Sequence, residues 1–351
     1  MAKKENEIIV CVQPVAGHGT FMDKSVVEAH SELYHYTTAA GLQGILESQQ
    51  LWATNIAYLN DAGEHTGFFD RRLPHLLEQP IRDVVEKAAS VHNDIDVEGT
   101  VQDERTHLCD CIRDLTIRFN DPYVTSFCST SRQDVRDNGL LSQWRGYGLD
   151  GGYAIVFATE GLQRLLDEEA KSFGYQFLYW GDVEYYDQDT IEKALHSETM
   201  DRERIVKETI GQICERTLHN LSALDWSVCA PLYEPTAILA CCHKHRGFRE
   251  EVEVRIVAAP WNAEVREENR KHGNSLPVKR VHFATKNGVH VPYIKLFGQK
   301  SNGNASKLPI TKVIVGPHPD RLKRQKSVEL LLEQYGTEAE VTVSDIPYLG
   351  R

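Results

Sequence analysis

Apolar residues recur at two spacings along the chain, and each spacing predicts a different type of element. A helix is predicted over about 38–48, because its apolar residues recur every three or four positions and Thr37 or Thr38 can cap its first turn. Alternating or short apolar runs predict strands in three further segments, 123–131, 151–157 and 248–259. Strands that are spread along the chain with helices between them are typical of an α+β fold.

These elements are predicted to form a single mixed-sheet domain over residues 1–351. Two helical insertions are expected at about 71–119 and 189–221, where apolar residues recur at helical spacing. A C-terminal strand–helix–strand element is expected at about 309–345, where "ITKVIVG", "DRLKRQKSVELLLEQYG" and "AEVTV" follow one another.

Composition narrows the class of protein. The chain is 41% hydrophobic and 26% charged, which is typical of a globular protein and excludes disordered and collagen-like classes. Its formal charge is -12 and no long basic run is present, so generic binding to duplex DNA is not expected. No signal peptide or membrane-spanning segment is predicted, and a cytoplasmic location without a membrane partner is therefore expected.

The eight cysteines do not show the paired spacing of a structural zinc site. The segment "CCHKH" at 241–245 contains residue types that bind metals. However, adjacent residues of an extended chain point to opposite sides, and no metal site is predicted.

The first candidate for binding chemistry is the histidine in "LYHYTT". His35 can hydrogen-bond a ribose hydroxyl or an amide, and Tyr34 and Tyr36 can offer flat faces to a ring. The alternative is a histidine that caps the following helix or is satisfied in the core.

The second candidate is a pair of carboxylates in "FREEVEVRIVAA". A strand would place Glu251 and Glu253 on one face, roughly 6 to 7 Å apart, with Arg255 continuing that face. Such a pair suits a reaction in which one carboxylate stabilises positive charge and the other activates an acceptor. The alternative is a solvent-facing strand with a ladder of glutamate and arginine.

The third candidate is the segment "SFCSTSRQD...LLSQWRGYG". Ser129 and Ser131 can orient a substrate by hydrogen bonding, and Trp144 and Tyr147 add stacking surfaces. A capped turn beside an aromatic core cluster is the alternative interpretation.

Four segments in this order resemble an uncharacterised bacterial family, number 2971 among the domains of unknown function. They are "LYHYTTAAGLQGILESQQLWATNIAYLND", "SFCSTSRQD...LSQWRGYG...GGYAIVF", "KHRGFREEVEVRI" and "LPITKVIVGP". The first segment also resembles the opening motif of ADP-ribosyltransferase-like folds, in which a strand presents a histidine beside a threonine before a helix.

The second resemblance implies an ADP-ribosyltransferase fold and NAD as co-substrate. The implied catalytic residues are Glu253, which stabilises the ribosyl oxocarbenium ion, and Glu251, which engages the acceptor. The residues that would bind NAD or a nucleotide are His35, Tyr36, Thr37, Ser129, Ser131, Trp144 and Tyr147.

The expected function is therefore transfer of ADP-ribose from NAD to a protein or nucleic-acid acceptor, in a bacterial stress or phage-defence setting that the resemblance suggests. One alternative is a non-catalytic module of the same fold that binds a nucleotide or a protein. A second is an RNA-processing enzyme. The sequence predicts neither the acceptor nor the oligomeric state.

Overall fold

The structure is a computed structural model that describes residues 21–22, 24–59, 67–92, 94–148, 151–186, 204, 206–212, 229–286, 288–298 and 306–347. Most of the second predicted helical insertion, at about 189–221, lies outside the described residues, and its described residues 204 and 206–212 are helical.

The strands are short to medium in length. They are β1 (Phe21–Met22), β2 (Glu32–Thr37), β3 (Leu51–Asn55), β4 (Tyr123–Cys128), β5 (Tyr153–Ala158), β6 (Tyr175–Asp182), β7 (Glu184–Tyr186), β8 (His243–His245), β9 (Glu253–Pro260), β10 (His282–Lys286), β11 (Val289–Leu296), β12 (Ile310–Val315) and β13 (Glu340–Val343).

The helices lie between these strands. The α-helices are α1 (Lys24–Ala29), α2 (Ala39–Ser48), α4 (Leu73–Ala89), α5 (Val97–Phe119), α6 (Gln133–Asn138), α7 (Leu141–Tyr147), α8 (Thr159–Ser172), α11 (Tyr233–Cys241), α12 (Ala263–Lys271) and α13 (Arg321–Gln334). A π-helix η2 (Phe68–Arg72) and the 3-10 helices η1 (Ile56–Tyr58), η5 (Ala230–Leu232) and η6 (Arg246–Glu251) complete the set.

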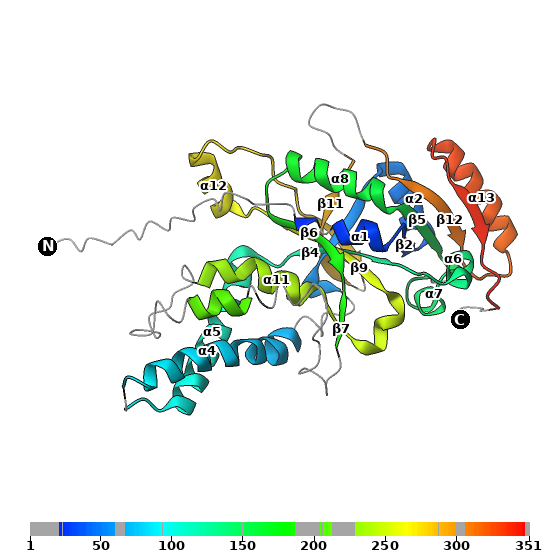
Figure 1. Cartoon of the computed structure of the whole chain (residues 1–351). Coiled ribbons are helices and arrows are strands. Elements are labelled where there is room, and N and C mark those ends of the chain that lie inside the picture. The colour runs from blue at the N-terminus through cyan, green and yellow to red at the C-terminus, as the bar shows by residue number, and fades with distance from the viewer. Residues whose placement is uncertain are drawn as a thin grey trace.

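Eleven of the described strands form one mixed sheet (Figure 1). Its main path is β1-β6-β9-β4-β2-β5-β12-β13. The pairs β1–β6 and β12–β13 are parallel, and the other pairs on this path are antiparallel. A branch leaves β4 through β3 and continues to β11 and β10. Strands β7 and β8 form a separate parallel pair.

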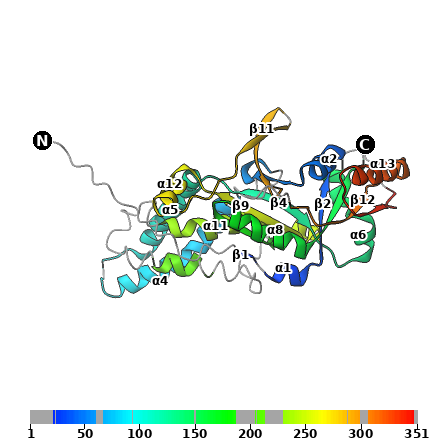
Figure 2. The ribbon, with the colours of Figure 1, turned by 90° about the horizontal axis from the view of Figure 1, so that it is seen from above.

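Helices cover both faces of the sheet because alternate side chains of each strand point to opposite sides. On β4, for example, Val124 packs with the hydrophobic cluster of α4, α5 and α11. Tyr123 and Phe127 pack with the cluster on the other face, which includes residues of α2, α8 and α13. Figures 1 and 2 show α2, α8 and α13 along the sheet and α4, α5 and α11 gathered at one end of the molecule.

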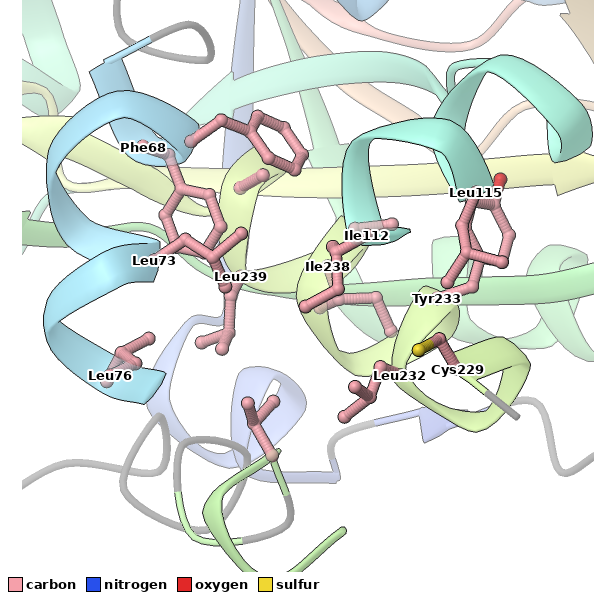
Figure 3. Close-up of a cluster of buried hydrophobic side chains, with 14 of the residues drawn as sticks. Phe68, Leu73, Leu76, Ile112, Leu115, Cys229, Leu232, Tyr233, Ile238 and Leu239 are labelled. Carbon is pink, nitrogen blue, oxygen red and sulfur yellow. The ribbon is translucent and has the colours of Figure 1, made fainter. Parts of the chain in front are cut away.

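The first helical insertion forms its own packed layer. Helices α4 and α5 lie in the predicted segment 71–119 and pack against α11. Figure 3 shows the apolar side chains that join them, including Leu73, Ile112 and Ile238. These side chains are buried, so the insertion extends the core of the protein.

Several predictions from the sequence agree with the structure. The α+β class with a mixed sheet is confirmed. Helix α2 begins after Thr38, whose hydroxyl accepts a hydrogen bond from the Gly41 N–H, and it buries the predicted apolar face. In the segment 309–345, β12, α13 and β13 follow one another in the predicted order. Among the described helices, none has the length and apolar character needed to cross a membrane.

Candidate functional site

A cleft opens where the central sheet splits beside β4. One edge of β4 pairs with β9 along its whole length. The other edge pairs with β3 at Tyr123 and Val124 but with β2 at Cys128 alone. Residues 125–127 therefore have no Cα partner on either of these two strands. The cleft at this split has a volume of about 300 Å³, and β2, β3, β4, α7, β8, β9, β10 and β11 all contribute side chains to its walls.

His35 lies in the split and bridges it. Its Nδ1 is 3.0 Å from the backbone carbonyl oxygen of Ser126. A carbonyl oxygen can only accept, so Nδ1 carries the ring proton and Nε2 is an acceptor in the neutral ring. Burial lowers the pKa of His35, and the bond to Ser126 opposes this in part. The neutral ring is therefore suited to accept a hydrogen bond from a ligand hydroxyl or amide.

Four buried charged residues in the cleft wall form what we call the ion cluster: Lys244, Glu251, Glu253 and Arg255. The Lys244 ammonium lies 2.8 Å from Glu251 Oε2 and 3.0 Å from Glu253 Oε2. Arg255 Nε donates to Glu253 Oε1 over 2.7 Å. Two cations and two carboxylates balance, which offsets much of the cost of removing these charges from water.

The electrostatics of the ion cluster keep one carboxylate ionised. Burial alone raises the pKa of Glu253, because it disfavours the charged form. Arg255 and Lys244, together with hydrogen bonds from Arg255 and Ser126, outweigh burial and lower the pKa from its ordinary 4.5 to about 2. Glu253 therefore presents a fixed negative charge at any physiological pH.

This lowered pKa predicts a specific pH dependence of stability. A carboxyl with a depressed pKa stabilises the fold above the unfolded value, and this contribution is lost as pH falls from about 4.5 to about 2. Because one pKa unit corresponds to about 1.4 kcal/mol, the full contribution is about 3 kcal/mol. We expect the difference in unfolding free energy between wild type and Glu253→Gln to shrink over this range, as measured by urea unfolding at successive pH values.

The matched control is Glu98→Gln on the surface, where the carboxyl pairs with Arg82 and is exposed to solvent. The difference in unfolding free energy between wild type and Glu98→Gln should depend much less on pH, because solvent screens the pair. Parallel pH profiles for wild type and Glu253→Gln would contradict the assigned environment of Glu253.

The two glutamates do not share one strand, so the prediction of a continuous strand over 248–259 is wrong in its first part. Strand β9 begins at Glu253, whereas Glu251 ends the 3-10 helix η6. Between them, Val252 has φ 41° and ψ 60°, a left-handed conformation that β-branched residues rarely adopt. The Ser129 N–H donates to the Val252 carbonyl over 2.9 Å and holds this turn. The turn lets both carboxylates reach Lys244, and both are buried rather than solvent-facing.

The predicted serines do not line the cleft. Ser129 is buried, and its hydroxyl lies 2.8 Å from Nδ1 of His30, whose Nε2 is 2.8 Å from Asp182 Oδ1. Ser131 is exposed on the segment after β4. Ser126 lines the cleft instead and hydrogen-bonds the glutamate that begins β9. Ser126 and Ser129 are separated by an odd number of positions, so an extended chain directs them to opposite faces.

The aromatic candidates divide between the cleft and the core. Tyr36 and Tyr147 line the cleft, whereas Thr37 and Trp144 do not. Trp144 is 1% exposed, donates its indole N–H to the Asn138 carbonyl over 2.9 Å, and packs edge-on against Tyr36. Trp144 is therefore part of an aromatic core cluster, the alternative interpretation of this segment. Tyr147, in contrast, is 43% exposed at the rim of the cleft.

Sequence reasoning missed several residues of the cleft. Lys244 was seen only as part of "CCHKH", and its contact with the glutamates depends on where β8 lies beside η6 and β9. Gln143 adds an amide to the cleft wall, and Trp52 and Tyr293 add aromatic rings from β3 and β11. No local sequence signal identifies Gln143, Trp52 or Tyr293, because the packing of elements that are distant in sequence brings them to the cleft.

Comparison with known proteins gives a family match over part of the chain. Residues 143–256 match the model of the family described as "Protein of unknown function (DUF2971)". The predicted resemblance to this family is confirmed over this segment. The match includes most of α7, all of β8 and the whole ion cluster, whereas His35 lies before it. Comparisons with curated proteins and with solved structures gave no match.

Proposed function

We propose that the protein is an NAD-using, ADP-ribosyltransferase-like enzyme whose active site is the cleft at the split sheet. In the proposed reaction the bond between the nicotinamide nitrogen and ribose C1′ breaks, and nicotinamide leaves with the bonding electron pair. A nucleophilic oxygen or nitrogen of the acceptor then bonds to C1′, and its proton passes to Glu251. Glu253 supplies the negative charge that stabilises the developing oxocarbenium ion.

The observation that carries this proposal is that His35 and Glu253, far apart in sequence, line the same cleft. Both residue types suit the proposed reaction. A neutral imidazole can accept a hydrogen bond from a ribose hydroxyl or carboxamide, and an ionised carboxylate can face the reacting carbon. The surrounding ion cluster keeps Glu253 in place before any ligand binds. A volume of about 300 Å³ lies at the lower end of the range for small-molecule sites.

His35→Phe is expected to weaken NAD binding by about tenfold. The phenyl ring preserves the contact with Phe127 but removes both the hydrogen bond to Ser126 and the ring acceptor. The measurement is titration calorimetry with NAD. Because burial lowers the pKa of His35, the wild-type affinity should change less around neutral pH than it would with a histidine of ordinary pKa.

The control for this variant is His290→Phe, an exposed histidine of β11 that does not line the cleft. It should bind NAD like wild type. Unchanged NAD affinity in His35→Phe would remove His35 from the proposed site.

A second candidate function is a non-catalytic module of the same fold that binds a nucleotide. It is favoured by the contacts of Glu253, whose two carboxylate oxygens both accept hydrogen bonds from Arg255 and Lys244. In this case the ion cluster is structural, and NAD binds in the cleft without being consumed. Titration of NAD together with a turnover assay on the same sample separates the two functions.

A further inference from the structure

The branch of the sheet formed by β3, β11 and β10 carries chemistry that the proposed catalytic residues do not use. In Figure 2 the strand β11 rises away from the rest of the sheet, and β10 pairs with it as an antiparallel hairpin. One face of this branch continues the wall of the cleft, through Trp52, Ala284, Lys286 and Tyr293. A ligand that fills the cleft can therefore extend onto the branch.

Three rings form a column on this face. Trp52 stacks on Tyr293 with ring centroids 4.0 Å apart and planes inclined by 21°, and His282 stacks on the other side of Tyr293 at 5.5 Å and 28°. Tyr293 is buried within the column, whereas Trp52 is 51% exposed at its end. An exposed indole at the end of a ring column offers a flat surface on which another ring can stack.

The charge of the branch is opposite to that of the whole chain. The formal charge of the protein is -12, but β3, β10 and β11 contain no Asp or Glu. They contain Lys286 and Lys295, and Arg280 lies just before β10. Lys295 and Arg280 are close to the ring column: burial lowers the pKa of His282, and these two cations lower it further.

We propose that the face of β3, β11 and β10 that continues the cleft binds single-stranded nucleic acid, with Trp52 stacking on an unpaired base and Lys286 close to the phosphate backbone. Stacking rings beside cations are the usual features of single-strand binding surfaces. A duplex is not the expected ligand because its bases are already stacked on one another.

Binding of nucleic acid at this face has a role in catalysis only if the proposed transfer of ADP-ribose is correct. Single-stranded nucleic acid bound to this face brings a base, sugar or phosphate group to the cleft. The proposed acceptor of ADP-ribose is therefore a nucleotide of that nucleic acid. The bond to ribose C1′ then forms from a nucleophilic nitrogen or oxygen of that nucleotide, and nicotinamide leaves with its electron pair as before.

The binding step can be tested without NAD. The experiment measures fluorescence anisotropy of labelled single strands of about 12 nucleotides, DNA and RNA, with the full chain at about 50 mM salt. We expect binding that weakens as the salt concentration increases and that favours single strands over duplexes. Binding should also weaken as the oligonucleotide is shortened. Trp52→Ala should weaken binding about tenfold, whereas Trp52→Phe, which keeps a ring, should retain most of it.

The matched control is Phe283→Ala. Phe283 is 66% exposed on the same hairpin, but it lies next to His282 in β10 and therefore points to the opposite face. Phe283→Ala should bind the oligonucleotide like wild type. In Lys286→Gln, the affinity for the oligonucleotide should depend less on salt concentration. The proposal is overturned by no binding of any oligonucleotide, by equal losses in Trp52→Ala and Phe283→Ala, or by a mononucleotide that competes as well as the full strand.

The two proposals fail in different ways. If the single strand binds through Trp52 but NAD is not consumed, the surface stands and the enzymatic proposal fails. If NAD is consumed and label is transferred to protein while no oligonucleotide binds, the enzymatic proposal stands and the surface proposal fails.

Discussion

Glu253→Gln is expected to lower NAD turnover by about 10²- to 10³-fold, which is the largest effect on activity that the proposed function predicts. The substitution keeps the size of the side chain but removes the negative charge under the developing oxocarbenium ion. It also leaves Lys244 and Arg255 with less compensation in a buried site, so the unfolding free energy should fall as well. Turnover must therefore be compared at a temperature where both proteins are folded.

Glu169→Gln separates loss of catalysis from loss of stability. Glu169 is 3% exposed and pairs with Lys279 at 2.6 Å, away from the cleft. Its replacement should lower stability in a similar way, because it also removes one charge from a buried pair, but it should leave turnover per folded molecule unchanged. Equal turnover in wild type and Glu253→Gln would show that Glu253 has no catalytic role.

Lys244→Met is expected to produce the largest loss of stability, about 3–5 kcal/mol in unfolding free energy. Lys244 is 3% exposed and its ammonium bridges Glu251 and Glu253, so its removal leaves two buried carboxylates with Arg255 alone. The measurement is urea unfolding at neutral pH, with circular dichroism as the probe.

The double variant Lys244→Met/Glu251→Gln tests whether this loss comes from charge imbalance. Removing Glu251 as well leaves Glu253 paired with Arg255, so the double variant should be more stable than Lys244→Met alone. If the loss of unfolding free energy in the double variant equals the sum of the losses in Lys244→Met and Glu251→Gln, the ion cluster is not a coupled unit.

Local patterns predicted the elements well because they depend on neighbouring residues. The helix after Thr38 follows from apolar periodicity and a cap, both visible over ten positions. The same reasoning selected His35 and Glu253, two residues that line one cleft. His35 stood out between two tyrosines, and Glu253 stood out as one of two carboxylates in a segment that alternates like a strand.

The remaining parts of the site depend on where strands end and on contacts between separate elements, which local patterns do not encode. Ser129 was selected in place of Ser126 because the serine-rich motif does not indicate where β4 ends and which face each serine takes. Lys244 was missed because its partners follow it across a turn. That turn is at Val252, whose left-handed backbone interrupts a sequence that alternates like a strand.

The most direct test of the central claim uses NAD labelled in its adenylate half, mixed with the purified protein and host lysate. The claim is that His35 and Glu253 form an NAD-consuming site in the cleft at the split sheet. Label should then appear on a macromolecule with wild type and with Glu169→Gln, and should be almost absent with Glu253→Gln. NAD that stays intact with all three proteins, although it binds to wild type, would contradict the claim and identify the cleft as a binding site without catalysis.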